Sequence, residues 1–428
     1  MLSVFGLITI LSFLILVITK RISVVTGLVI IPIILGLLAG ISIDALGKMM
    51  LEGLKQVAPT GIMLVFSVLY FAIMLEVGLF QPIIQLILKL VGGDPLKILI
   101  GTAILTMLVH LDGDGTATFM IIITAFLPLY EKLGIKNTYL AGIVALAVGP
   151  IHLVPWSGTS ARAIATLQVD SSEIFVPNLI PILGGILWVL FVAYYWGKKE
   201  RIRLGIKGNL ENSIHFNTNE LAYNRPKLIV FNALLTILIL FLLIKGFWPT
   251  PVLFVVGSML ALWINFPDLK TQSEVFKLHG TSIYSVSSMI FAAGIFSGIL
   301  TGSGMIEAMA NDLVALIPSG NAQYLPIFTA ITAMPASLLF TPDAYYFGLV
   351  PILSETMTNL GGEAIQIGRA ALLGQMTVGF PLSPLTASTF LLLSLTKTDL
   401  GEHQKQTFFW AWGTSIIMTI LAIIFGSI

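Results

Sequence analysis

The sequence predicts an all-α polytopic membrane protein built as an inverted repeat of five transmembrane helices plus one re-entrant hairpin per half, with one broken helix per half. Hydrophobic residues make up 57% of the 428 residues and charged residues only 10%, whereas soluble domains carry roughly 25% charged residues. Apolar segments near the roughly 20 residues that span a bilayer recur along the chain. We therefore expect a multi-pass protein of the plasma membrane, embedded in the lipid bilayer.

The apolar segments divide into continuous and interrupted ones. Residues 138–170 and 365–396 are apolar but interrupted by Pro, Gly and Ser, which is typical of broken helices. Residues 42–56 and 303–317 carry charges at helical spacing and are predicted to lie at the membrane interface. The N-terminal segment lacks a basic region and a cleavage pattern, which favours a retained span. The candidate spans are 2–19, 22–40, 60–79, 174–196, 227–246, 250–266, 284–301 and 406–426.

The hairpins are predicted from pairs of short apolar segments. Residues 97–109 and 116–131 each reach only about 20 Å as helices, and both outer ends carry a lysine. They form a re-entrant hairpin with DGDG at its tip if those lysines share a side of the membrane. Residues 323–340 and 343–358 repeat the pattern with TPDA at the tip.

The predicted halves are residues 1–196 and 227–428, joined by a cytoplasmic linker at 197–226 that is too short and polar to be a domain. With the N-terminus outside, this topology places most of the 22 Lys and Arg residues in the cytoplasm, as the positive-inside rule requires. The odd number of crossings per half makes the second half inverted. PWSGTSAR at 155–162 and PLSPLTAS at 381–388 are similar, which indicates a duplication.

Non-helical backbone at membrane depth must be buried in protein or face a water-filled cavity, so both tips and both breaks are predicted to converge on a central site. The first half supplies the candidate binding residues Asp112, Gly113, Asp114, Gly115, Thr116, Thr118, Trp156, Ser157, Gly158, Thr159, Ser160 and Arg162. The second half supplies Thr341, Pro342, Asp343, Tyr345, Ser383, Pro384, Thr386 and Ser388.

The charged candidates have specific chemistry and simpler alternatives. Asp112 and Asp114 are spaced to hold a hard cation, as the first ligands of an EF-hand are, and Asp343 is the third candidate metal ligand. The alternative is that the two tip aspartates cap the following helix. Arg162 can bind a carboxylate in a bidentate fork. Its alternative is an internal ion pair with Asp112 or Asp114.

Three residues are candidates for carrying a coupling proton: Asp343, Glu76 and His152. His110 and His152 could also ligate a metal, although a lone histidine in such a place is more often only hydrogen-bonded. The absence of cysteine excludes disulfides and thiol chemistry, and a net charge of +1 gives no case for nucleic acid.

Four motifs in order resemble the citrate–metal–proton symporter (CitMHS) family of the ion transporter superfamily. They are LDGDGTATF, PW-x-G-x-x-AR followed by VDSSEIF, LFTPDAYYFGLVPIL, and FPLSPLTAST followed by DLGEHQ. The resemblance implies uptake of citrate complexed with a divalent cation of the Mg or Ca type, driven by protons, with no permanently bound cofactor. It also implies a homodimer that moves by an elevator-like shift, with tips and broken helices lining the site.

The sequence departs from the family pattern at the site itself, with His152 and Ser157 around the first break and Glu76 where Asp is common. These departures leave open a carrier of another hydroxycarboxylate, malate- or gluconate-like, coupled to protons or sodium. A passive channel and an intramembrane aspartyl enzyme are further alternatives. The enzyme is disfavoured because no GxGD-type context is present, so we expect a transporter and not an enzyme.

Overall fold

The computed structural model describes residues 1–205, 223–315 and 322–428, and every regular element in these ranges is helical. Seven helical stretches among the described residues are long and apolar enough to cross a membrane. The first half contains α1 (Leu2–Ile18), α2 (Val24–Leu38), α3 (Ile43–Glu76), α4 (Gln81–Val91), α5 (Pro95–Val109), α6 (Gly115–Leu133), α7 (Asn137–Ile151), α8 (Gly158–Leu167), α9 (Ser171–Phe175) and α10 (Leu179–Leu204).

The second half contains α11 (Ile229–Lys245), α12 (Thr250–Asn265), α13 (Leu269–Gly302), α14 (Met305–Val314), α15 (Leu325–Ala336), α16 (Val350–Asn359), α17 (Ala364–Leu372), α18 (Ala387–Thr396) and α19 (Leu400–Ile424). A π-helical turn, Ala344–Leu349, leads directly into α16. Thus the prediction of an all-α polytopic membrane protein is confirmed.

Two predicted boundaries are wrong, each because a charged segment continues a helix. Residues 42–56 form the first part of α3, which runs on without a break through the predicted span at 60–79. Likewise α13 begins at Leu269, well before the predicted 284. Helix α10 continues to Leu204, into the first part of the predicted linker, and residues 206–222 lie outside the described residues, so the linker stays a prediction.

Two pairs of helices, one member from each half, have equal lengths. Helices α3 and α13 each have 34 residues and begin 226 positions apart (269 − 43). Helices α8 and α18 each have 10 residues and begin 229 positions apart (387 − 158). Both of the latter end at a non-glycine residue with positive φ, Gln168 at +58° and Lys397 at +54°. An aspartate then caps the next helix, Asp170 for α9 and Asp399 for α19. These matches support the predicted duplication; its inverted relation and the half boundaries stay predictions.

Helices α5 and α6 form a hairpin whose two outer ends meet at the C-terminal end of α10. Arg201 pairs with Asp94, which caps α5, with Nε 2.9 Å from Oδ1. Arg203 donates to the carbonyl of Gly134, directly after α6, at 2.6 Å. The hairpin therefore enters and leaves at the face where the linker begins.

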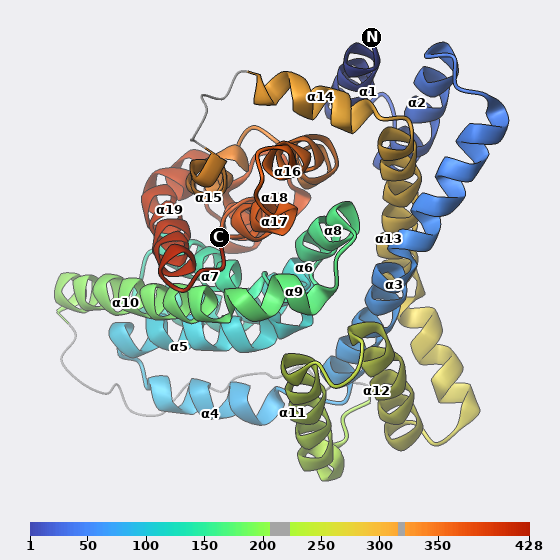
Figure 1. Cartoon of the computed structure of the whole chain (residues 1–428). Coiled ribbons are helices and arrows are strands. Elements are labelled where there is room, and N and C mark those ends of the chain that lie inside the picture. The colour runs from blue at the N-terminus through green and yellow to red at the C-terminus, as the bar shows by residue number, and fades with distance from the viewer. Residues whose placement is uncertain (206–222, 316–321) are drawn as a thin grey trace.

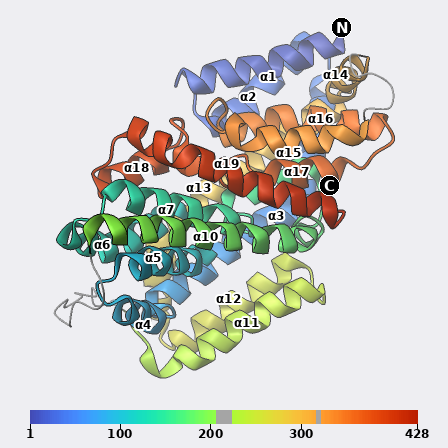
Figure 2. The ribbon, with the colours of Figure 1, turned by 90° about the vertical axis from the view of Figure 1, so that its left-hand side faces the viewer.

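The second hairpin, α15 and α16, is tied to α14. Asn359 at the end of α16 donates to Asn311 of α14 at 3.0 Å, and Ser3 beside the N-terminus of α1 bonds to Asp312 of α14. Figure 2 shows α4, which precedes the first hairpin, and α14, which precedes the second, at opposite ends of the molecule.

Helices α3 and α13 pack closely against each other along one side of the molecule, as Figure 1 shows. Gly53 of α3 sits at the crossing, where an added Cβ would lie 2.0 Å from the carbonyl oxygen of Gly294 and 2.9 Å from the Cα of Gly298. Small residues four positions apart let membrane helices approach to backbone contact, where packing stabilises them.

Replacing Gly53 by leucine is expected to destabilise the protein by about 3 kcal/mol, because the side chain has to displace the α13 backbone. The measurement is thermal unfolding of purified protein in detergent. Gly47→Leu is the matched control on the same helix, since a Cβ there meets nothing within 4 Å, and it is expected to change stability by less than about 0.5 kcal/mol. Equal melting of the two variants would contradict the close crossing.

Candidate functional site

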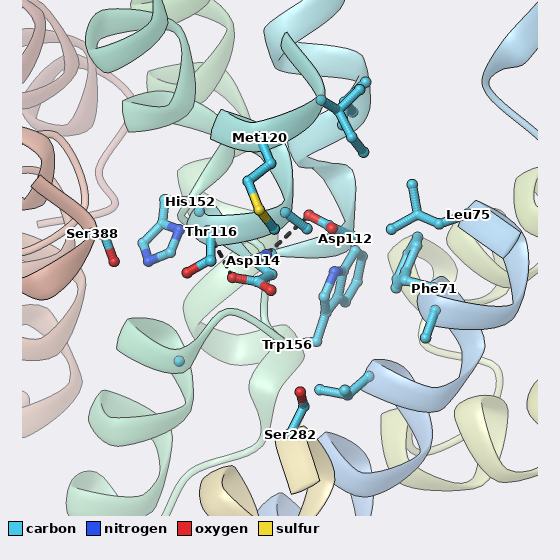
Figure 3. Close-up of a pocket in the computed structure, with 18 of the residues that line it drawn as sticks. Phe71, Leu75, Asp112, Asp114, Thr116, Met120, His152, Trp156, Ser282 and Ser388 are labelled. Atoms are coloured by element: carbon cyan, nitrogen blue, oxygen red, sulfur yellow. Dashed lines mark hydrogen bonds between the residues drawn. The ribbon is translucent and has the colours of Figure 1, made fainter. Parts of the chain in front are cut away.

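A cavity of about 1420 Å³ brings together residues from both hairpin tips and both helix breaks. Figure 3 shows part of its lining. The predicted residues that line it are Asp112, Gly113, Asp114, Gly115, Thr116, Trp156, Gly158, Thr159, Arg162, Pro342, Thr386 and Ser388, together with Glu76 and His152. The remaining predicted residues are outside this lining: Thr118, Ser157, Ser160, Thr341, Asp343, Tyr345, Ser383 and Pro384.

Three helices present their N-terminal residues to the cavity. Gly115 and Thr116 begin α6, Gly158 and Thr159 begin α8, and Thr386 is the residue before α18. The first turn of a helix has backbone amides without a partner in the helix, and it is the positive end of the helix dipole. Three such ends on one cavity favour an anionic ligand.

The DGDG tip is a tight turn in which each aspartate uses one oxygen locally. Asp112 Oδ1 accepts from the backbone N of Asp114 at 2.9 Å, and Asp114 Oδ1 accepts from the backbone N of Thr116 at 2.8 Å. Asp114 is therefore the N-cap of α6, as the capping alternative predicted. Gly113 has φ +80°, and a Cβ there would lie 3.2 Å from the Cα of Ser157. The tip thus packs directly against the break before α8.

The second carboxylate oxygens of Asp112 and Asp114 make no hydrogen bond or ion pair to any described residue. Both side chains line the cavity, so these oxygens can face a cation there. Among the described residues, however, no group of three or more His, Cys, Asp or Glu side chains is placed to hold a metal. A cation between the two aspartates therefore needs ligands from elsewhere, such as substrate oxygens or water.

Arg162 links the two halves. Its Nε lies 2.7 Å from Oδ1 of Asp343, and its Nη1 donates to the carbonyl of Gly158 at 2.7 Å. The side chains of Arg162 and Asp343 are only 12% and 9% exposed. The internal ion pair considered from the sequence exists, but its partner is Asp343 and not Asp112 or Asp114. Asp343 is therefore an ion-pair partner here and is separate from the two tip aspartates.

The two histidines of the first half contact each other. His110 Nε2 lies 2.8 Å from His152 Nδ1, and the rings stack with centroids 5.0 Å apart. His110 Nδ1 lies 3.0 Å from the hydroxyl of Thr118. His110 is fully buried, whereas His152 lines the cavity. Each histidine was expected to be hydrogen-bonded, and the structure shows that the two are bonded to each other.

Helices α3 and α13 provide a wall of the cavity that was not predicted from the sequence. Phe71 and Leu75 of α3 and Ser282 and Ser285 of α13 line the cavity. Phe71 stacks on Trp156 with centroids 5.1 Å apart, and the Trp156 indole donates to the carbonyl of Leu111 at 2.8 Å. A signal for α13 was present in TSIYSVSS at 281–288, which puts two serines on one helix face within an apolar segment.

The cavity reaches the face of the molecule where α3 ends and Arg225 lies. Its lining includes Glu76 and Gly78 at the C-terminal end of α3, where the neighbouring carbonyl of Val77 accepts a hydrogen bond from the backbone N of Arg225 at 3.0 Å. Arg225 closes the linker on its C-terminal side. The conformation described is therefore one in which the cavity extends from the helix termini towards this face.

Residues 7–379 match the family described as "Citrate transporter" (CitMHS). The chain belongs to the citrate transporter family. It is 46% identical over 428 residues to a "Citrate transporter" of Bacillus subtilis (strain 168), with both chains fully covered. It is 43% identical over 434 residues to a "Mg(2+)/citrate complex secondary transporter" of the same organism, covering 100% of this chain and 99% of that one.

The fold is similar to that of solved transporters. The crystal structure of the Alcanivorax borkumensis YdaH transporter superposes with a TM-score of 0.61 at 15% identity, covering 89% of this chain and 88% of that one. Neisseria gonorrhoeae MtrF gives 0.51 at 13% identity, covering 89% and 84%. These likenesses concern the fold. The family assignment confirms the resemblance seen in the sequence, and this citrate transporter family member is a multi-pass membrane transporter and not an enzyme.

The ion pair between the halves predicts a measurable coupling. Arg162→Gln and Asp343→Asn should each destabilise the protein by about 3 kcal/mol, because each leaves the other charge buried and unpaired. The double variant should lose less than the sum, with a coupling of about 1–3 kcal/mol in thermal unfolding. The surface pair Lys397–Glu131, with side chains 64% and 44% exposed, is the control and should couple by less than about 1 kcal/mol. Additive losses at Arg162 and Asp343 would contradict the pairing.

Proposed function

We propose that this protein takes up citrate as a complex with a divalent cation, in symport with protons. One observation carries the proposal: three helix N-termini and Arg162 line the same cavity as two aspartates that each have an oxygen without a partner among the described residues. Helix amides and a guanidinium bind carboxylates, whereas carboxylate oxygens bind hard cations. A ligand that has both kinds of group is a metal–carboxylate complex. The name of the Mg²⁺/citrate relative supports this assignment.

The charges of the wall explain why the cation is needed. Free citrate is a trianion near neutral pH, and Asp112 and Asp114 would repel its carboxylates at close range. A divalent cation between the aspartates and citrate turns that repulsion into attraction, and it lowers the net charge of the ligand. The volume of about 1420 Å³ leaves room for a complex that keeps several waters, as Mg²⁺ complexes do.

Arg162 gives the second half of the chain a part in binding. In the described conformation its Nε is held by Asp343, which directly precedes the turn leading into α16. A substrate carboxylate competes with Asp343 for the same guanidinium. Substrate binding therefore loosens the contact between α8 and the second hairpin. Dimer formation and an elevator-like movement stay predictions.

The cation requirement is tested by citrate uptake into proteoliposomes with Mg²⁺ or with a chelator. We expect most uptake to be lost in the chelator, because citrate alone meets two uncompensated aspartates. Asp114→Asn is the matched variant: asparagine still caps α6, but the site loses one negative charge, so stimulation by Mg²⁺ should fall. Equal uptake with and without divalent cations would remove the metal from the proposal. Competition by malate and gluconate tests the substrate in the same assay.

Glu76 is the residue for which we expect a role in proton coupling. It is the one acidic cavity-lining residue besides the two tip aspartates among the described residues, and its carboxylate lies 3.9 Å from Nε2 of His279. In Glu76→Gln, an imposed pH gradient should no longer drive citrate accumulation, while citrate–citrate exchange continues. Glu52→Gln, on the exposed start of the same helix, is the control. Accumulation by Glu76→Gln at the wild-type level would exclude this residue, and wild-type uptake that ignores the pH gradient would exclude proton symport.

A further inference from the structure

A chain of hydrogen bonds runs from the first hairpin to the cavity through two histidines. The hydroxyl of Thr118 lies 2.9 Å from the backbone carbonyl of Asp114, and His110 Nδ1 lies 3.0 Å from the same hydroxyl. His110 Nε2 then lies 2.8 Å from His152 Nδ1. His152 is at the end of the chain, and its side chain is among those lining the cavity in Figure 3.

The direction of each hydrogen bond follows from the first one. A carbonyl only accepts, so the Thr118 hydroxyl donates its single hydrogen to Asp114. The hydroxyl can then only accept from His110, which places a hydrogen on His110 Nδ1. His110 is 0% exposed and makes no ion pair with any described residue, and an isolated buried cation is costly. His110 is therefore neutral and its Nε2 accepts.

The hydrogen-bond direction at His110 also determines which nitrogen of His152 carries the hydrogen. Because His110 Nε2 accepts, His152 Nδ1 is the donor, and a neutral His152 then has no hydrogen on Nε2. No described residue makes a hydrogen bond to His152 Nε2, and this atom is not among the fully enclosed polar atoms that lack a partner. The ring is clamped between His110 and Phe380, with centroid distances of 5.0 Å and 4.7 Å. His152 Nε2 is thus a fixed, uncharged hydrogen-bond acceptor in the cavity wall.

We propose that His152 Nε2 accepts a hydrogen bond from the hydroxyl of citrate, and that this contact makes the site select a hydroxytricarboxylate over the same acid without the hydroxyl. This inference rests on citrate being the substrate. Fully ionised citrate has carboxylate oxygens that only accept and a single O–H that donates. The helix N-termini and Arg162 supply donors for the carboxylates, whereas the hydroxyl needs an acceptor. A carboxylate placed against the bare nitrogen would set two acceptors against each other.

The divalent cation strengthens the same contact. A hydroxyl or water oxygen bound to a metal ion becomes more acidic, and so a better donor. Asp112 and Asp114, two other acceptors in the wall, are the proposed neighbours of the cation. His152 is then an acceptor that stays available to the hydroxyl.

The test measures equilibrium binding to purified protein, by calorimetry at fixed Mg²⁺, of citrate and of tricarballylate, which is citrate without its hydroxyl. His152→Asn keeps an amide donor at the Nδ1 position and removes the acceptor, whereas His152→Gln keeps an amide oxygen near the Nε2 position. Thr118→Val removes the hydroxyl that orients His110, and Thr118→Ser retains it. Metal complexation in solution is identical for all variants, so the change in the ratio of the two dissociation constants reports the protein alone.

We expect wild type to prefer citrate, and His152→Asn to lower that preference about tenfold, as loss of one hydrogen bond to a buried hydroxyl predicts. Thr118→Val should also lower the preference for citrate. The preferences of His152→Gln and Thr118→Ser should stay within about threefold of the wild-type value. An unchanged preference in both His152→Asn and Thr118→Val overturns the inference and leaves the proposed function intact. If His152→Asn does not fold, the Thr118 pair decides alone. Failure of wild type to bind citrate contradicts the proposed function, and with it the inference.

Discussion

The hydrocarbon core of the bilayer contains no water to hydrogen-bond the backbone groups that are left unpaired where a helix is interrupted. This constraint shapes the whole protein. Each break in a helix has to find its polar partners within the protein or in a water-filled cavity. The hydroxyl of Ser337, at the second tip, accepts from the backbone N of Met376 at 2.9 Å, and the hydroxyl of Ser383 donates to the carbonyl of Ser337 at 2.5 Å. Thr159 at the start of α8 donates to the carbonyl of Met376 at 3.0 Å. Two of these bonds join the second tip to the second break, and the bond from Thr159 joins the first break to the second half.

The polar groups that remain after this mutual pairing form the site. Helix N-termini that other segments cannot cover open onto one cavity, together with the carboxylates of the first tip. A buried arginine is costly without a partner, and Asp343 supplies one from the opposite half. The broken helices are stable in the membrane because their polar groups converge at one place. The same convergence creates a binding site for an anion together with its cation.

The cavity lies between two groups of helices that are packed differently. On one side, α3 and α13 cross at glycines with almost no space between their backbones. On the other side are the hairpins and broken helices, with polar side chains directed inwards. Aromatic contacts such as Phe71 on Trp156 join the groups across the cavity wall. A tight crossing beside a polar cavity gives the site one firm wall and one wall built from loops and helix ends.

The sequence alone determined the membrane class, the short hairpin segments and the positions of the breaks, because span length, charge content and Pro–Gly–Ser interruptions are local properties. It also identified most of the lining residues from the first tip and the first break. The sequence could not show that Arg162 pairs with Asp343, 181 positions away, or that His110 and His152 contact each other. It also missed the α3 and α13 wall and the continuity of α3 through its charged first turns. Those features depend on which helix faces meet in three dimensions, and only tertiary packing decides that.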